Sequence, residues 1–380
     1  MKNILITGGA GFIGSNLSLQ LLKKGYRITV LDNLHPQIHG ENPEQTSPLY
    51  QSVKDKVCFI KGDVSNKNDW HSALDGQHIV VHLAAETGTG QSMYEIERYT
   101  TVNVSGTSIL LDYLTNSAHQ IEKVIIASSR AIYGEGKYID SKTNQYFYPN
   151  NRAETDLQNG IFELRNPIHE NEFLTACATD EQSNIHPNSI YGLTKYYQEQ
   201  ALMICCKSLN IPCVAFRYQN VYGPGQSLTN PYTGILSIFS SRIMQQKPVN
   251  IFEDGNESRD FVFIDDAVNA TVSGIEKSEA DFCSFNVGTG KATTVLEVAK
   301  SLMKNYEKEI PLEVTGQYRK GDIRHNFADM HFIKERLGFT PAVDFETGIA
   351  KFCDWVKSQE IKNDQYEQSL AEMRSKGLMK

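Results

Sequence analysis

Long apolar runs are missing from this sequence of 380 residues. No stretch approaches the about 18 consecutive apolar residues that a membrane-spanning helix needs, so we expect no membrane partner. The first apolar run is short and lacks the charged start and the cleavage site of a secretory signal, so we expect a cytoplasmic protein. The sequence also has no internal repeat and no low-complexity linker, which argues against separate domains on a flexible tether.

Positive charge and paired cysteines are scarce as well. Lysine and arginine number 37 against 45 aspartates and glutamates, and the net charge is −8. A nucleic-acid partner would require a basic face, so the net charge argues against this class of partner, and we expect no nucleic-acid partner. The seven cysteines are odd in number and scattered, without a C-x-x-C pair. The sequence therefore predicts neither a disulfide framework nor a metal site, and its cysteine use is typical of a reducing cytoplasm.

The start of the chain, in contrast, carries a pattern of strand, tight turn and helix. An apolar run at residues 4–6 is followed by Gly8, Gly11 and Gly14, and then by leucines at helical spacing. In a dinucleotide site the first glycine permits the turn, the second lets the phosphates approach, and the third lets the helix pack on the strand. A glycine turn that binds nothing is the alternative interpretation.

Asp32 favours the dinucleotide. It ends the second apolar run, RITVLD, at about the twenty-residue offset at which a carboxylate binds the ribose of the cofactor. Its charge would repel the 2′-phosphate of NADP, and the next residue, Asn33, begins a stretch without an arginine to offset that charge. The sequence therefore predicts NAD as the cofactor.

Further apolar runs alternate with helical patterns, such as the one at residues 102–114. This alternation predicts an α/β fold with a Rossmann-type doubly wound parallel sheet. Ligands of such sheets bind at the carboxyl ends of the strands. The residues at those ends are Asp63, Ala84, Ala85, Ser128 and Ser129.

Changes in composition divide the chain into parts. We expect an NAD-binding domain over residues 1–220, with a polar loop at 35–51 and an insertion at about 137–187 that is either functional or a solvated surface loop. Residues 221–357 should form most of a smaller C-terminal α/β substrate lobe, with some crossing of the chain back to the first domain. The elements expected in the rest of the chain are a helix at 230–243, two short strands around a turn at 254–256, a helix at 345–356, and a loose helix in the charged tail, 358–380.

Tyr191 and Lys195 stand four residues apart in a strongly helical segment. This spacing places both side chains on one face of a helix. A cation beside a phenol lowers the pKa of the phenol, so the pair predicts a tyrosine that acts as a base near neutral pH. A surface tyrosine beside a solvated lysine is the alternative, and the nucleotide pattern, Ser128, Ser129 and Asn103 weigh against it.

With these residues in view, the sequence resembles the extended short-chain dehydrogenases/reductases of the nucleotide-sugar epimerase/dehydratase type. The resemblance runs to about residue 356. It rests on GGAGFIG, LDN, GDV, VHLAAE, SSRAIYG, SIYGLTKYYQE, FRYQNVYGPGQ, EDGNESRDFVFIDD, FNVGTG and the RKGD that contains Arg319.

The resemblance implies three sets of site residues. The catalytic residues would be Ser129, Tyr191 and Lys195. The cofactor-binding residues would be Gly8, Gly11, Phe12, Ile13, Gly14, Asp32, Asn33, Asp63, Val64, Leu83, Ala84, Ala85, Asn103, Ser128, Tyr191, Lys195, Tyr218 and Val221. The substrate-binding residues would be Glu86, Ser129, Arg130, Asn220, Asn230, Arg259, Arg319 and Asp322, with the two C-terminal-lobe arginines on the diphosphate of a nucleotide sugar.

One departure from the family separates two of its reactions. The 4,6-dehydratases carry an Asp-Glu pair directly after the catalytic threonine, whereas this chain has Arg130 and Ala131 there. Alanine transfers no proton and arginine stays protonated, so dehydration is not expected. Arg130 itself is assigned either to a contact with the sugar or the insertion, or to an ion pair with Glu135.

The insertion makes the segment between Ser129 and Tyr191 far longer than is usual in the family. The insertion and the GPGQSLTNPYTG stretch are similar to the dTDP-L-rhamnose 4-epimerases, which implies transient oxidation of a sugar at C4. Epimerisation of another UDP-, GDP- or CDP-hexose at C4 or C2, reduction of a 4-keto sugar, and a binding module with a degraded site are the alternatives. The resemblance also implies a homodimer formed by the helices around 102–114 and 191–207.

Overall fold

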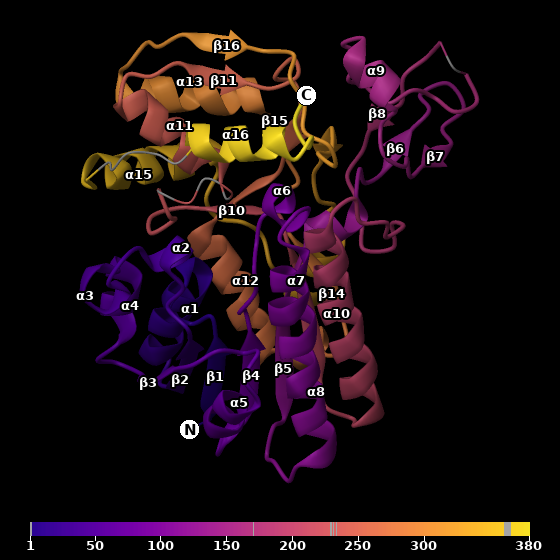
Figure 1. Ribbon diagram of the computed structural model, residues 1–380. Helices are drawn as coiled ribbons and strands as arrows, with labels where there is room; N and C mark the ends of the chain where they lie inside the picture. The colour runs from indigo at the N-terminus through magenta and orange to yellow at the C-terminus, as the bar shows by residue number, and fades with distance from the viewer. Residues whose placement is uncertain (1, 170, 229, 231, 233, 361–365) are drawn as a thin grey trace.

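The computed structural model describes residues 2–169, 171–228, 230, 232, 234–360 and 366–380. The lower half of the molecule in Figure 1 is built on a seven-stranded sheet in which every neighbouring pair of strands is parallel. The strand order is β14-β9-β5-β4-β1-β2-β3. These strands are β1 Asn3–Thr7, β2 Arg27–Asp32, β3 Cys58–Lys61, β4 Ile79–His82, β5 Lys123–Ser129, β9 Cys213–Tyr218 and β14 Ser284–Val287.

Helices cover both faces of this sheet, because successive side chains of its buried strands point to opposite faces. Ile4 and Ile6 pack in one hydrophobic core with α1 and α12, whereas Leu5 packs in a second core with α5, α8 and α10. The helices are α1 Phe12–Lys23, α5 Lys67–Leu74, α8 Gly106–Asn116, α10 Ile190–Ser208 and α12 Ile264–Glu276. This arrangement confirms the predicted doubly wound fold. The helix expected at 102–114 begins as a π-helix, Thr100–Ser105.

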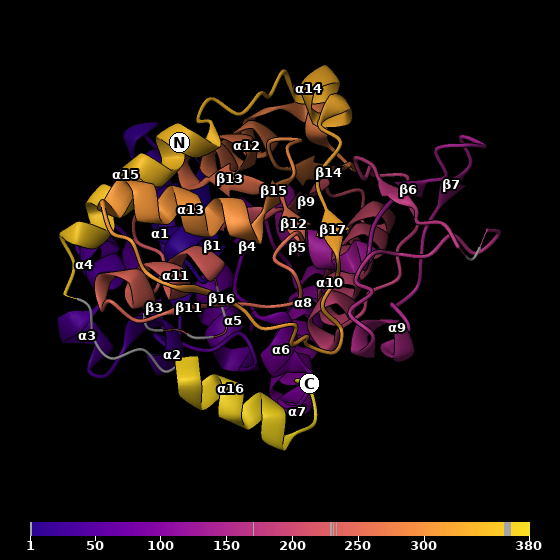
Figure 2. The same ribbon diagram turned by 90° about the horizontal axis from the view of Figure 1, so that it is seen from above.

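A smaller α/β lobe lies over the carboxyl ends of the strands (Figures 1 and 2). Its helices are α11 Ile235–Met244, α13 Val295–Tyr306 and α15 Phe345–Lys357. Its strands are β11 Val249–Ile251 with β16 Leu312–Val314, β12 Ser258–Arg259 with β15 Thr293–Thr294 and β17 His325–Asn326, and β10 Asn220–Tyr222 with β13 Phe261–Phe263. Between these elements the chain returns to the large sheet as α12 and β14, and α14 His331–Leu337 packs beside β14. The helix predicted at 345–356 is confirmed as α15.

The prediction of a polar loop at residues 35–51 is wrong. Three short helices occupy this segment: α2 Pro36–His39, α3 Pro43–Thr46 and α4 Pro48–Val53. Each begins with a proline, whose fixed φ suits the first helical position and whose missing N–H would have no partner there. The prolines are therefore helix starts rather than loop markers.

Two expectations in the second lobe need correction. The strands on either side of the turn at 254–256, β11 and β12, do not pair with each other, since β11 joins β16 and β12 joins β15 and β17. The helix expected at 230–243 begins at Ile235, after a segment in which positions 229, 231 and 233 lie outside the described residues.

The insertion folds into a unit of its own beside the second lobe (Figure 1). It forms a three-stranded antiparallel sheet in the order β7-β6-β8 and a short helix, α9. Tyr138, Leu164 and Leu174 form its small core. The elements are β6 Tyr138–Ile139, β7 Tyr146–Phe147, α9 Glu154–Gln158 and β8 Thr175–Ala176.

The tail is not a loose helix. Its helix α16 Tyr366–Ser375 packs through Tyr366, Leu370 and Met373, and Met379 joins the same hydrophobic cluster. The charged side chains of this segment lie on the outer side of the helix. Because they are so frequent, the apolar positions of the other face are not apparent from the sequence. No helix among the described residues is both long enough and apolar enough to cross a membrane.

Candidate active site

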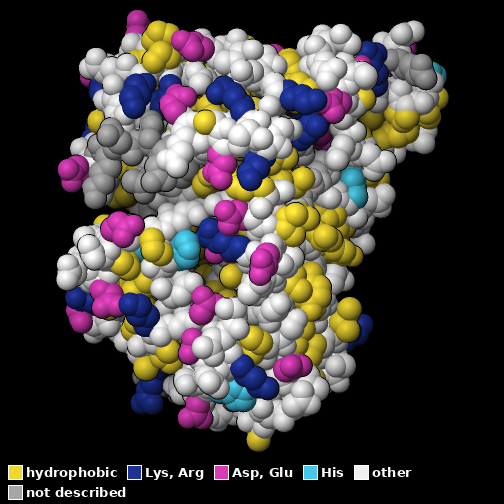
Figure 3. Space-filling model, viewed as in Figure 1, with side chains coloured by type: hydrophobic (Ala, Val, Ile, Leu, Met, Phe, Trp, Pro, Cys, Tyr) yellow, Lys and Arg dark blue, Asp and Glu magenta, His cyan; other side chains and the backbone are white. Residues whose placement is uncertain are grey.

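A cleft of about 570 Å³ lies between the sheet and the second lobe. The space-filling view shows the groove that separates the two halves of the molecule on this side (Figure 3). The carboxyl ends of β1, β2, β4, β5 and β9 form its floor, as expected for a doubly wound sheet. The predicted site residues that line it are Gly8, Gly11, Phe12, Ile13, Gly14, Asp32, Asn33, Val64, Leu83, Ala84, Ala85, Glu86, Ser128, Ser129, Arg130, Tyr191, Lys195, Tyr218, Asn220, Val221, Arg259, Arg319 and Asp322.

Three predicted site residues do not line the cleft. Asp63 accepts a hydrogen bond from Asn33 Nδ2 at 2.8 Å, so it orients Asn33, which lines the cleft. Asn103 is fully buried, and its side chain bonds both the N–H and the C=O of Glu86, so it shapes the loop after β4. Asn230 is buried and accepts a hydrogen bond from Gln37, which lines the cleft. The geometry favours supporting roles for all three.

The glycine turn fits a dinucleotide. Gly8 has a φ of +67°, which side chains rarely allow. A Cβ on Gly14 would lie 2.2 Å from Gly8 O, so only glycine lets α1 start this close to β1. The N–H groups of the first turn of α1 stay available for phosphate oxygens.

Asp32 ends β2 with its carboxylate held in place. Oδ2 accepts a hydrogen bond from Ala10 N and Oδ1 one from Leu34 N, both at 2.9 Å, and His39 Nε2 lies 3.6 Å from Oδ1. A carboxylate oriented in this way at the edge of the cleft can accept bonds from a ribose diol. The residues present therefore fit NAD.

Ser129, Tyr191 and Lys195 meet at the centre of the floor. Ser129 ends β5, and α10 is capped by Ser189, whose hydroxyl accepts a hydrogen bond from Gly192 N. The cap starts the helix one residue before Tyr191, so Tyr191 and Lys195 stand one turn apart in the cleft. Lys195 Nζ donates to Gln198 Oε1 at 2.8 Å.

Burial decides the protonation of these groups. Burial raises the pKa of Tyr191 above its usual 10, although a hydrogen bond from Ser129 and the positive charge of Arg130 both lower it. Burial also lowers the pKa of Lys195 to about 7, against the opposing effect of Glu199. The expectation that Lys195 lowers the pKa of Tyr191 is therefore wrong for this structure, in which the cation acting on the phenol is Arg130.

Sequence reasoning missed the network behind the floor. Glu199 is fully buried, forms an ion pair with Arg217 at 2.6 Å, and accepts a hydrogen bond from the Ser128 hydroxyl. Gln198 and Glu199 follow Lys195 at helical spacing, which is the signal that could have found them. This network connects β5, α10 and β9 beneath Ser129, Tyr191 and Lys195.

Cationic side chains gather at the second-lobe end of the cleft. Arg259 is oriented by backbone carbonyls, with Nη2 donating to Ile323 O at 2.7 Å. Arg319 pairs with Asp322, Nη2 to Oδ2, at 2.6 Å. Arg130 donates from Nε to Asn220 Oδ1 at 2.9 Å, and Glu135 pairs with Arg152 instead of with Arg130. Three guanidinium groups therefore line the cleft, and groups of this kind can bind an anionic portion of a ligand.

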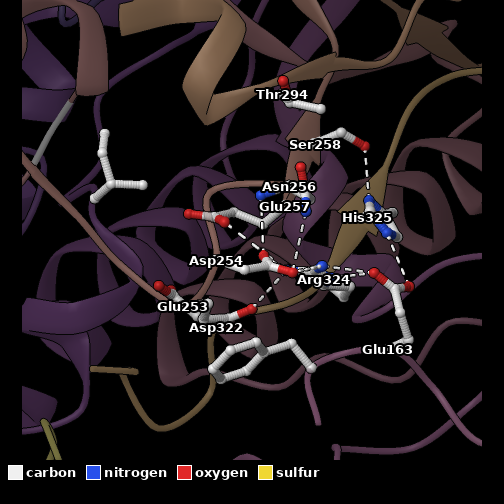
Figure 4. A network of polar contacts seen from close by, with 12 residues as sticks. Glu163, Glu253, Asp254, Asn256, Glu257, Ser258, Thr294, Asp322, Arg324 and His325 are labelled. Atoms are coloured by element: carbon white, nitrogen blue, oxygen red, sulfur yellow. Dashed lines mark hydrogen bonds and ion pairs between the residues drawn. The ribbon is translucent and has the colours of Figure 1, made fainter. Parts of the chain in front are cut away.

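A second polar network lies behind this end of the cleft (Figure 4). Arg324 is almost fully buried and contacts Glu163 of the insertion, Glu253 and Asp254. Among the described residues, Glu253, Asp254 and Glu257 lie close enough together to share a cation. Because the guanidinium of Arg324 already lies among these carboxylates, protein groups compensate their charge.

Comparisons with known proteins agree with this geometry. The family model described as "NAD dependent epimerase/dehydratase family" matches residues 4–152 and 172–288. The chain is 37% identical over 360 residues, 94% of this chain and 96% of the other, to a dTDP-L-rhamnose 4-epimerase of Burkholderia thailandensis.

Solved structures are similar over nearly the whole chain. The UDP-glucuronic acid 4-epimerase of Bacillus cereus, in complex with UDP-glucuronic acid and NAD, has a TM-score of 0.75 and 26% identity, covering 93% of this chain and 99% of that one. The UDP-glucose 4-epimerase of Thermotoga maritima has a TM-score of 0.73 and 29% identity, covering 93% and 98%. The chain belongs to the NAD-dependent epimerase/dehydratase family and is an NAD-dependent enzyme of that family.

Proposed function

We propose that this enzyme inverts C4 of a nucleotide sugar by transient oxidation, interconverting dTDP-L-rhamnose and dTDP-6-deoxy-L-talose. The observation that carries the proposal is that Ser129, Tyr191 and Lys195 line the same cleft as Arg259 and Arg319. Ser129 is hydrogen-bonded to Tyr191, and Arg130 lies close enough for its charge to act on Tyr191. The similarity to the dTDP-L-rhamnose 4-epimerase of B. thailandensis supports the choice of sugar and nucleotide.

In this proposal, residues of the cleft floor transfer the proton of the sugar 4-hydroxyl. Tyr191, as phenolate, takes the proton of the sugar 4-hydroxyl while Ser129 hydrogen-bonds the same oxygen. Bound NAD⁺ supplies the hydride acceptor at C4, and the reduced cofactor supplies the donor for the return step. Lys195 lines the cleft one helix turn from Tyr191, and the positive charge that lowers the pKa of Tyr191 is that of Arg130.

The far end of the cleft holds the diphosphate while the sugar turns its other face to the cofactor. Arg259 and Arg319 suit this role, because guanidinium groups bind phosphate oxygens through two parallel hydrogen bonds. Dehydration is disfavoured because Ala131, which lines the cleft with Ser129, has no group to transfer a proton.

The test is an NMR spectrum of dTDP-L-rhamnose incubated with the purified enzyme and no added cofactor. We expect the H4 signal of the talo epimer to appear and to reach the same ratio when the reaction starts from dTDP-6-deoxy-L-talose. Formation of a 4-keto sugar only when NAD⁺ is added, with one NADH formed per sugar oxidised, would instead indicate a reductase acting in reverse. An unchanged spectrum would contradict the rhamnose assignment, and UDP-, GDP- and CDP-hexoses would then be assayed in the same way.

We also propose that two copies associate through α8 and α10, and that the enzyme works in the cytoplasm. The seven cysteines are all free in the structure, which supports a reducing compartment.

A further inference from the structure

The C-terminal strap, residues 366–380, touches both halves of the molecule. Its buried side chains pack against Tyr94 on the sheet side of the cleft and against Ile238 and Phe252 of the second lobe. Met373 Sδ also lies against Gly90, 3.3 Å from where a Cβ would stand. Seen from above, α16 lies along one side of the molecule beside α6 Thr89–Ser92 and α7 Ile96–Tyr99 (Figure 2).

The end of the strap pairs with the segment that carries Arg319. Tyr318 N donates to Lys380 O at 2.9 Å, Lys380 N donates to Tyr318 O at 3.1 Å, and Lys320 N donates to Leu378 O at 2.8 Å. Arg319 stands between these paired residues, so the last residues of the chain hold the backbone of a predicted diphosphate anchor.

Tyr366, at the start of the strap, lines the cleft. The guanidinium carbon of Arg242 lies 5.0 Å from the centre of its ring, and Arg242 also pairs with the neighbouring Glu367 at 2.7 Å. These contacts fix the ring at the cleft wall.

The walls around Tyr366 are apolar. Phe252 and Ile238 line the same part of the cleft, and the guanidinium carbon of Arg319 lies 5.3 Å from the centre of the Phe252 ring. Flat aromatic walls next to arginines suit a planar base whose attached phosphates reach the cations.

We propose that the C-terminal strap is part of the nucleotide-sugar site, with the Tyr366 ring in contact with the nucleoside and the paired end of the strap holding the Arg319 loop on the diphosphate. This inference rests on the proposed function for the presence of a nucleoside diphosphate in the cleft. It assigns a binding role to a segment that lies beyond the 4–288 span of the family model.

The test is the affinity of the NAD-loaded enzyme for dTDP, measured by titration calorimetry. We expect Tyr366→Ala to weaken dTDP binding about tenfold, because loss of one aromatic contact to a base has an effect of that order. Tyr366→Phe keeps the ring and should bind within about twofold of the wild type. Gln368→Ala, an exposed position on the same helix, should bind like the wild type, and the NAD content of all variants should be unchanged.

Unchanged dTDP affinity in Tyr366→Ala, or an equal loss in Tyr366→Phe, would overturn the inference. Should Tyr366→Ala fail to fold, Tyr366→Leu keeps an apolar side chain at this buried position and gives the same comparison. If dTDP binding depends on Tyr366 but dTDP-L-rhamnose is not converted, only the proposed function fails. If the wild-type enzyme binds neither dTDP nor UDP, both proposals are wrong.

Discussion

Arg130 places a positive charge near Tyr191, the proposed base. Its charge lowers the pKa of Tyr191, against the larger effect of burial, which raises it. Burial and the nearby Arg259 lower the pKa of Arg130 itself to about 9, so it stays charged at neutral pH. We expect Arg130→Met to raise the pKa of Tyr191 and to move the acid limb of the kcat profile to higher pH.

The measurement is the initial rate of epimerisation by the NAD-loaded enzyme across the pH range in which it stays folded. Arg130→Lys keeps the charge and should restore much of the original profile. An acid limb that stays in place in Arg130→Met would contradict the electrostatic role of Arg130.

The proposed role of Tyr191 as base is tested by Tyr191→Phe, which removes only the phenolic oxygen. Tyr191→Phe keeps the ring at the cleft and removes the proton acceptor, so turnover should fall by at least about 100-fold. The NAD content, measured after denaturation, and the melting temperature should match those of the wild type. Near-normal turnover would remove Tyr191 from the role of base.

The sequence revealed where these side chains stand but not how they are charged. Helical spacing placed Tyr191 and Lys195 on one face of α10, and the position after an apolar run placed Ser129 at a strand end. The pKa direction of Tyr191 was missed because burial, which dominates it, depends on the folded surroundings of the side chain and not on its spacing along a helix. Arg324 was missed because its carboxylate partners are far away along the chain.

At the scale of elements, the insertion contacts the loop that carries Arg319, one of the proposed diphosphate anchors. Arg152 of the insertion donates to both carboxylate oxygens of Glu253, at 2.8 and 2.9 Å, and to Asp322 O at 3.0 Å. The pair with Glu253 is buried on both sides. Removing one partner of a buried ion pair leaves an uncompensated charge, so Arg152→Ala should lower the free energy of unfolding by about 3 to 5 kcal/mol.

Urea unfolding followed by circular dichroism measures this difference. The matched control is Arg165→Ala, also in the insertion, which removes a pair with Asp156 whose arginine is 36% exposed. We expect less than about 1 kcal/mol there. Equal losses in the two variants would mean that Arg152 is not a brace, and Arg152→Ala should also raise the KM for the nucleotide sugar more than it lowers kcat.

Element types followed from the sequence where the pattern was long. The strands of the large sheet and the helices α10 and α15 have many buried positions at a regular period. The two-residue strands of the insertion are too short to show a period, so that segment was interpreted as irregular. Tyr366, Leu370 and Met373 do recur at helical spacing in the tail, but the surrounding charges concealed that they pack.

At the scale of the whole molecule, one face of α10 remains exposed although it is apolar. Leu193, Tyr197 and Ile204 are 52%, 37% and 69% exposed, and Tyr197 OH lies 2.8 Å from Ser108 Oγ of α8. Two such faces can bury each other around a twofold axis, which is the usual symmetry of a dimer. The proposed homodimer would therefore place α8 and α10 of both copies in one bundle.

Ile204→Glu tests this association, because a charge buried without a partner opposes it. We expect light scattering after size-exclusion chromatography to give twice the chain mass of 42.7 kDa for the wild type and a single chain mass for Ile204→Glu. Val314→Glu, at an exposed apolar position on β16 of the second lobe, should remain dimeric. A monomeric wild type would contradict the proposed dimer. If the wild type and both variants are dimeric, the dimer interface does not include the exposed face of α10. Since α10 carries Tyr191 and Lys195, a monomeric Ile204→Glu that keeps full turnover would show that each copy holds a complete site.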